Sequence, residues 1–381
     1  MIRYGRQFLD KNDIEGVVSV LKSDFLTQGK TSSILERDIC AKFHTKAGCV
    51  VSSGTAALHL VSKVLNWKAK DLIICSPITF VATANSIIYS EASPLFVDID
   101  PNTFNLCPDK TEYELRKDKK KKIRAIIATD YAGNPCNWKD FRFLANKYNL
   151  SLVNDNCHAI GAKYNNDISY AAKYADLVCH SYHPVKNITT GEGGAVISNN
   201  LSLVKKIKIL RNHGLYKKNT PSFIPDPGKM VSLGYNYRLS DINCMLGITQ
   251  LKKLDKFLKR RTEIARAYDN EFSGINYLKT QFIKKQDKSA YHLYPILIDF
   301  KKIGKNKIEL FKLFYKNKIL PQVHYIPIYR HLFYKKKFNT VYKNFIHAEN
   351  FYKNEISLPI YYTLKNGQIK KVVKILKDFI S

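Results

Sequence analysis

The chain has little acidic charge and no long hydrophobic run. Its 381 residues include 32 Asp and Glu against 62 Lys and Arg, which gives a formal net charge of +30. No apolar stretch approaches the roughly 18 residues of a membrane span, and residues 1–6 carry no apolar core of a signal peptide. We therefore expect a cytoplasmic protein, with enough apolar content to form about two domains.

Cysteine is also scarce, and its eight copies are scattered singly. They form no Cys-x-x-Cys pair and no Cys/His cluster at zinc spacing. His180 and His183 lack a nearby pair of carboxylates that would complete a metal site. This pattern predicts reduced thiols and no bound metal.

The excess of lysine is spread along the whole chain. Its short clusters, at 116–122, 259–261 and 335–337, do not interleave aromatic residues as base-stacking surfaces do. We interpret the charge as a compositional bias, and keep a basic nucleic-acid-binding protein as a remote alternative. A positive field would also speed the capture of a small polyanion.

Strand-like and helix-like runs alternate over the first half of the chain, after two helices at 13–21 and 33–43. This alternation predicts an α/β fold with a mainly parallel sheet wrapped by helices. The expected strands are 48–52, 72–75, 94–97, 123–129, 150–153, 176–179 and 195–198, and the expected helices between them are 56–65, 82–89, 109–116 and 138–148.

The pattern changes at Leu239, where a long amphipathic helix begins that we expect to continue to Tyr268. A strand at 292–298 and helices at 308–317 and 369–379 then predict a smaller α+β domain. We expect a large domain over 1–248, and an interdomain helix with a small domain over 249–381. The basic last helix could lie on a membrane surface, but ordinary packing is favoured.

Lys186 stands on a corner between two strand-like runs, within His180 to Gly194. Glycines at 191, 193 and 194 let a bulky planar ligand approach the backbone closely. Lys186 is therefore a candidate former of a Schiff base. A plain surface lysine is the alternative in so lysine-rich a chain.

Three other segments supply what such a lysine would need. Ser53-Gly54-Thr55-Ala56 lies where a strand passes into a helix, and helix N-termini favour phosphate. Asp155 ends a strand at the edge where open α/β sheets bind ligands, and Phe80 could stack on a flat ring. Each signal alone is weak, but together they meet the requirements of pyridoxal 5'-phosphate (PLP). The carboxylate would keep the pyridine nitrogen protonated, and desolvation would lower the pKa of the lysine so that it can act as a base.

These residues recur in a known order. The segments 53–56, 77–80, 155–161, 181–194 and 234–239 together resemble the sugar aminotransferases of the DegT/DnrJ/EryC1/StrS group, over essentially the whole chain. Further stretches resemble the branch of this group that acts in pseudaminic acid biosynthesis, namely Tyr4, 24–29, 130–133, 292–296 and 322–327.

The resemblance implies a PLP-dependent transferase of fold type I, which has a large domain with a mixed, mostly parallel sheet and works as a homodimer with shared active sites. It implies that Lys186 holds the cofactor and shuttles the proton, that Asp155 pairs with the pyridine nitrogen and that His158 lies near the ring hydroxyl. Phe80 would stack on the ring. Phosphate contacts would come from Gly54, Thr55, Ala56, Ser181 and, in the neighbouring subunit's site, Asn236. Contacts to the nucleotide sugar would come from Tyr4, Asp24, Phe25, Leu26, Thr27, Gly54, Ser181, Asn236, Arg238, Gln322, Val323, His324 and Tyr325.

The implied reaction moves an amino group from L-glutamate to C4 of UDP-2-acetamido-2,6-dideoxy-β-L-arabino-hexos-4-ulose. Two alternatives remain: another nucleotide 4-keto-6-deoxy sugar, of the perosamine, viosamine or bacillosamine type, and a non-catalytic regulatory use of the fold. The chain has Asn154-Asp155-Asn156-Cys157 where many relatives have Glu-Asp-Ala-Ala. Lys186 argues against the branch with histidine at this position, because histidine cannot form the imine.

Overall fold

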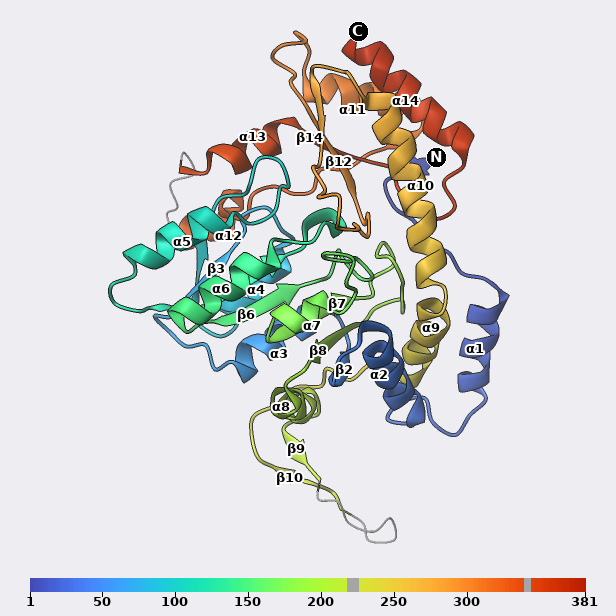
Figure 1. Cartoon of the computed structure of the whole chain (residues 1–381). Coiled ribbons are helices and arrows are strands. Elements are labelled where there is room, and N and C mark those ends of the chain that lie inside the picture. The colour runs from blue at the N-terminus through green and yellow to red at the C-terminus, as the bar shows by residue number, and fades with distance from the viewer. Residues whose placement is uncertain (218–225, 339–343) are drawn as a thin grey trace.

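The computed structural model describes residues 1–217, 226–338 and 344–381. Its centre is a seven-stranded sheet in the order β2-β8-β7-β6-β5-β3-β4 (Figure 1). Strand β8 is antiparallel to both of its neighbours, and the other pairs are parallel. The predicted mixed, mostly parallel α/β fold is thereby confirmed. The strands are β2 (Ala47–Val51), β3 (Leu72–Cys75), β4 (Ser93–Phe96), β5 (Ile123–Thr129), β6 (Ser151–Asp155), β7 (Leu177–Ser181) and β8 (Gly194–Ser198).

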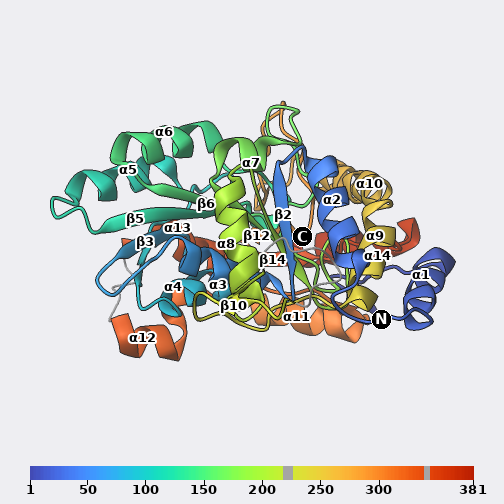
Figure 2. The ribbon, with the colours of Figure 1, turned by 90° about the horizontal axis from the view of Figure 1, so that it is seen from below.

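Helices cover both faces of this sheet because its strands are apolar on both sides. In β5, Ala125 and Ile127 pack into one core cluster, whereas Ile126 and Ala128 pack into another. Figure 2 shows α5, α6 and α7 on one face and α3 and α4 on the other. The helices of this part are α2 (Lys30–Phe43), α3 (Gly54–Val64), α4 (Val81–Ile88), α5 (Pro108–Lys117), α6 (Trp138–Tyr148), α7 (Tyr170–Tyr174) and α8 (Leu201–Arg211), followed by the short strands β9 (Leu215–Tyr216) and β10 (Lys229–Met230).

The last third of the chain, from α10 (Leu254–Phe272) onward, lies mostly above the sheet in Figure 1. Its antiparallel sheet has the order β11-β12-β14, and α10, α11 and α14 pack near it around a separate core cluster. The last helix, α14, buries Ile369, Val372 and Leu376 in this cluster. The elements after α10 are β11 (Leu278–Thr280), β12 (Tyr294–Ile298), α11 (Lys307–Lys316), β13 (Ile319–Leu320), α12 (Leu332–Phe338), α13 (Ile346–Asn354), β14 (Glu355–Leu358) and α14 (Asn366–Ile380).

The N-terminal segment is attached to this C-terminal half. Strand β1 (Ile2–Arg3) pairs in parallel with β13, with Ile2 opposite Ile319, and the amide of Ile360 donates to the carbonyl of Tyr4 at 2.9 Å. The division at residue 248 stays a prediction. None of the helices in the three described ranges is long and apolar enough to cross a membrane.

The long helix expected from Leu239 to Tyr268 is in fact two helices, so that prediction was wrong. Helix α9 (Asp241–Leu251) ends before Lys252, and α10 (Leu254–Phe272) begins after Lys253. Neither proline nor glycine marks the break in the sequence. Lys253 instead forms ion pairs with Asp10, the N-cap of α1, and with Asp13 in α1. These contacts join segments that are distant in the sequence.

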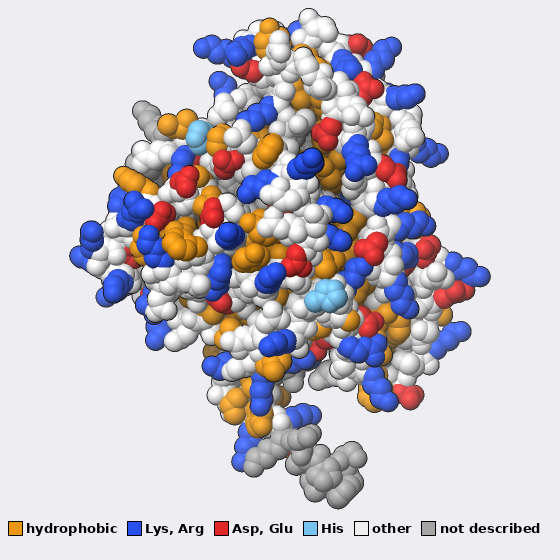
Figure 3. Space-filling view, viewed as in Figure 1, with side chains coloured by type: hydrophobic (Ala, Val, Ile, Leu, Met, Phe, Trp, Pro, Cys, Tyr) orange, Lys and Arg blue, Asp and Glu red, His pale blue; other side chains and the backbone are white. Residues whose placement is uncertain are grey.

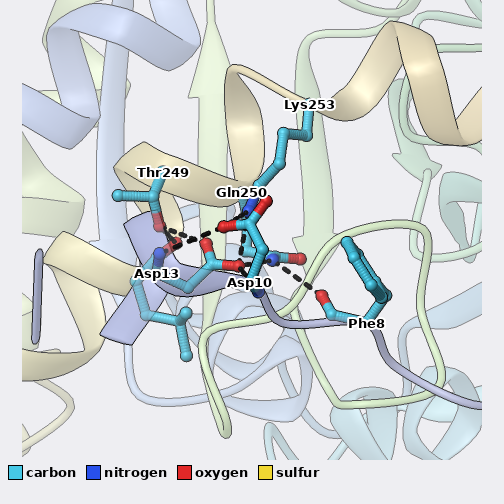
Figure 4. A network of polar contacts seen from close by, with 7 residues as sticks. Phe8, Asp10, Asp13, Thr249, Gln250 and Lys253 are labelled. Carbon is cyan, nitrogen blue, oxygen red and sulfur yellow. Dashed lines mark hydrogen bonds and ion pairs between the residues drawn. The ribbon is translucent and has the colours of Figure 1, made fainter. Parts of the chain in front are cut away.

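These carboxylates form a network that docks α1 (Lys11–Leu21) on α9 and α10 (Figure 4). Asp13 is buried and accepts hydrogen bonds from Thr249 Oγ1 at 2.5 Å, from Gln250 Nε2 at 3.0 Å and from the ammonium of Lys253. The same ammonium donates to Asp10 at 2.8 Å, and Asp10 caps α1 in a capping box with Asp13. The buried charge is thus fully paired, as a buried carboxylate requires.

We expect the substitution Asp13→Ala to lower the free energy of unfolding by about 2–4 kcal/mol, because it removes the buried carboxylate that Lys253, Gln250 and Thr249 share as an acceptor. The control is Glu15→Ala on the same helix, which removes an exposed ion pair with Lys11 and should change stability by less than about 0.5 kcal/mol. Urea unfolding of both variants measures the difference. Equal losses would show that the network does not anchor α1.

Candidate active site

A cavity of about 340 Å³ lies where strands β5, β6 and β7 end. In the paired register, Thr129 of β5 lies opposite Asp155 of β6, and Asp155 opposite Cys179 of β7. Parallel strands therefore deliver their terminal side chains to one edge of the sheet. The cavity gathers these predicted site residues: Tyr4, Gly54, Thr55, Phe80, Asp155, His158, Ser181, Lys186, His324 and Tyr325.

Lys186 follows β7 in a turn that Gly194 permits. A Cβ on Gly194 would lie 2.6 Å from the carbonyl oxygen of His180 and 2.7 Å from the backbone of Ser53, so only glycine fits. Burial lowers the pKa of Lys186 because it disfavours the ammonium, against the opposing effects of Cys157 and Asp155. The amine nitrogen lies 3.5 Å from Nε2 of His292. Lys186 is thus a nitrogen poised to act as nucleophile or base.

Asp155 is buried at the end of β6 and held by hydroxyl groups. The hydroxyl of Thr83 donates to its Oδ2 at 2.6 Å, and the amide of Cys157 donates to Oδ1 at 3.3 Å. Thr79 lies within hydrogen-bonding distance of both Thr83 (2.9 Å) and Thr129 (3.2 Å). This series of hydrogen-bonded hydroxyl groups fixes the direction of the Asp155 carboxylate, which can therefore face a cationic nitrogen without rotating.

His158 is buried beside these groups and is neutral. Its pKa lies well below the usual value because of burial and because Lys186 and His324 are nearby. The amide of Ala132 donates to Nδ1 at 3.3 Å, so the ring proton is on Nε2. This nitrogen lies 3.0 Å from the hydroxyl of Tyr325 and donates to it.

Another wall of the cavity is formed where Gly54 and Ser181 lie close together. Gly54 begins α3, whose first amide groups lack partners within the helix. A Cβ on Gly54 would lie 2.8 Å from Cβ of Ser181. Phe80, at the N-cap of α4, is half exposed and lines the same cavity. An amine, a fixed carboxylate, an anion-binding helix end and an aromatic ring therefore fit PLP.

A protein-family model described as the DegT/DnrJ/EryC1/StrS aminotransferase family matches residues 7–377. The chain belongs to this family. A curated relative from Campylobacter jejuni, named UDP-4-amino-4,6-dideoxy-N-acetyl-beta-L-altrosamine transaminase, is 42% identical over 99% of this chain and 96% of its own. The family resemblance expected from the sequence is thereby confirmed.

Solved structures of family members show the same fold. PseC of Helicobacter pylori, an aminotransferase involved in the biosynthesis of pseudoaminic acid, is 35% identical and superposes with a TM-score of 0.90 over 100% of this chain and 99% of its own. The PLP form of a putative sugar aminotransferase from Streptococcus pneumoniae is 26% identical, with a TM-score of 0.88 over 99% and 98% of the two chains.

Other predicted site residues of this family member are not among those that line the cavity. The amide of Ala56 is taken by Oγ of Ser53 at 3.0 Å. Arg238 donates to Asn212 at 2.6 Å, and Asn236 pairs with the same asparagine in an isolated bridge. The remaining residues outside the cavity lining are Asp24, Phe25, Leu26, Thr27, Gln322 and Val323. Their roles stay predictions, and the role of Asn236 concerns a neighbouring subunit.

Sequence reasoning missed several residues that line the cavity. Thr83 lies one helical turn after Phe80 on α4, and this i, i+3 spacing could have identified it. Thr79 and Thr129 stand next to residues that the motifs did single out. His292 belongs to a quoted motif but received no role. His183 and Glu192 also line the cavity, in the turn on either side of Lys186.

We expect Gly54→Ala to weaken PLP binding by about tenfold or more, because the added methyl group would lie 2.8 Å from Cβ of Ser181, in the wall of the cavity that we expect to bind the phosphate. Titration of the apoprotein with PLP, followed by absorbance, measures the change. Gly367→Ala is the matched control, since a Cβ there meets nothing within 4 Å. Equal affinity in the two variants would show that this wall does not hold the cofactor.

Proposed function

We propose that this chain is a PLP-dependent transaminase that moves the amino group of L-glutamate to C4 of UDP-2-acetamido-2,6-dideoxy-β-L-arabino-hexos-4-ulose. The product is UDP-4-amino-4,6-dideoxy-N-acetyl-β-L-altrosamine, on the route to pseudaminic acid. The supporting observation is that Lys186 and Asp155 face one cavity in a member of the family. The choice of sugar is supported by the full-length relatives from C. jejuni and H. pylori.

The lining residues divide the work of such a reaction. When bound, PLP supplies an aldehyde that exchanges amines and a cationic ring that withdraws electrons. Lys186 would hold it covalently, and with its lowered pKa the free amine could accept the α-proton of the donor and return it to a neighbouring carbon. Asp155, fixed by Thr83, would face the ring nitrogen. Gly54, Thr55 and Ser181 would bind the phosphate group.

The substrate side of the cavity supports a homodimer. Within the described part of the chain, Lys186 is the only Lys or Arg side chain that lines the cavity. A nucleotide sugar, by contrast, carries an anionic diphosphate. A second copy of the chain would supply further cations from outside this cavity, and Arg238 suits this role. Exposed apolar side chains that are close in sequence to the predicted substrate residues 24–27 and Arg238 suit a subunit interface. They are Phe25, Leu26, Met230, Val231 and Leu233.

The alternative of nucleic-acid binding has less support. Lys and Arg side chains are scattered over the whole visible face in Figure 3, with acidic ones between them, and do not line one groove. A surface of this kind speeds the arrival of anionic substrates in general.

The charge of Asp155 should matter more than its shape. We expect Asp155→Asn to keep PLP attached to Lys186 but to lose about 10²–10³-fold in turnover, because a neutral amide cannot hold the ring nitrogen cationic. Absorbance of the bound cofactor and product formation are measured together. Wild-type turnover in this variant would assign the protonation to another group.

A panel of ketosugars tests the substrate. Purified enzyme with L-glutamate is incubated with UDP-, GDP- and dTDP-linked 4-keto-6-deoxy sugars, with Lys186→Ala as the inactive control. We expect glutamate to bleach the cofactor band and the UDP-linked sugar to be aminated at least about tenfold faster than the others. A preference for a GDP or dTDP sugar would refute the substrate, and no bleaching would favour a non-catalytic role.

A further inference from the structure

His292 comes from the C-terminal half, yet its ring reaches the amine of Lys186. Its Nε2 lies 3.5 Å from Nζ of Lys186, 106 positions away in the sequence. Its ring centroid lies 4.6 Å from that of His158. The side chain is buried and lines the cavity. It therefore touches the nitrogen that carries the chemistry.

The loop that carries His292 is tied directly to the lysine turn. Asn187, the next residue after Lys186, donates from Nδ2 to the carbonyl of Ala290 at 2.7 Å. The buried guanidinium of Arg261 donates to the carbonyls of Tyr291 and His292 at 2.9 and 3.2 Å. The position of the ring relative to the amine is thus fixed from both sides.

The same loop is also tied to the turn that holds His158. The amide of Ala290 donates to the carbonyl of Gly133 at 2.9 Å, and the amide of Leu293 donates to that of Ala132 at 3.3 Å. Ala132 in turn donates its own amide to His158. Both histidines and the lysine therefore share one rigid frame.

The ring of His292 is neutral. Within the part of the chain that the structure describes, its Nδ1 is buried without a hydrogen-bond partner. Burial lowers its pKa well below the usual value, and the neighbouring basic groups Lys186, His158, Arg261 and His324 act in the same direction, because a proton on any of them would repel a charge on this ring. In the neutral tautomer that carries its proton on Nδ1, the lone pair of Nε2 faces the lysine amine.

We propose that His292 is a positioning residue for Lys186: its Nε2 accepts a hydrogen bond from the free lysine amine and holds that amine toward the reacting carbon. A lysine side chain has several rotatable bonds, so an unheld amine would spend most of its time in unproductive directions. This inference rests on the proposed transaminase function and adds a residue to its site.

Two variants at this position separate hydrogen bonding from packing. His292→Phe keeps an aromatic ring but removes the acceptor, whereas His292→Gln places an amide oxygen near the site of Nε2. Two rates are followed by absorbance: bleaching of the holoenzyme by protiated and α-deuterated L-glutamate, and covalent attachment when PLP is added to the apoprotein. The second rate does not depend on turnover.

We expect His292→Phe to slow both rates by about 10–100-fold and to raise the primary deuterium isotope effect, because proton transfer becomes the slow step. His292→Gln should restore both rates to within about threefold of the wild type. Should the Phe variant not fold, His292→Asn, whose amide cannot reach the Nε2 position, replaces it with the same expected results.

Unchanged rates and an unchanged isotope effect in the Phe variant would overturn the inference. Equal losses in the Gln and Phe variants would also overturn it, since they would indicate a packing role. If wild-type protein neither attaches PLP nor is bleached by glutamate, the proposed function fails and the inference with it. Normal wild-type behaviour with an unaffected Phe variant removes this inference alone.

Discussion

The register of the parallel strands β5, β6 and β7 is the constraint on which the site depends. Because Thr129 lies opposite Asp155 and Asp155 opposite Cys179, the carboxylate, its hydroxyl support and the turn of Lys186 meet at one edge of the sheet. A slip of one residue would send Asp155 to the other face.

The far wall of the cavity depends on contacts from the opposite end of the chain. Tyr4 is held by the amide of Ile360, and its ring lies 4.9 Å from that of His324. The amide of His324 donates to the buried carboxyl of Glu355 at 3.0 Å, and burial raises the pKa of that carboxyl to about 8. Tyr131 donates its hydroxyl to the carbonyl of His324. This wall is thus assembled from segments that are distant in the sequence.

Charge is distributed unevenly between the surface and the site. The excess of 30 positive charges lies largely on scattered surface lysines, whereas His158, His292 and His324 all have lowered pKa values because they are buried near Lys186. The rings that act on the amine of Lys186 are therefore neutral rather than cationic. Such surroundings favour a neutral lysine, which both imine formation and proton transfer require.

The sequence by itself determined the positions of the seven strands and of most helices that pack on them, the glycine-rich corner of Lys186, and the candidates Asp155 and Phe80, but not the helices α7 and α8 or the strand order. The features that it determined are local, because strand and helix periodicity, turn glycines and helix ends are encoded within a few neighbouring residues. Only the tertiary structure decided that α9 and α10 are separate helices, that Thr83 holds Asp155 and that His292 reaches Lys186. Each of these depends on contacts between side chains and backbone groups that only the packed fold brings into place, and no local pattern had assigned them.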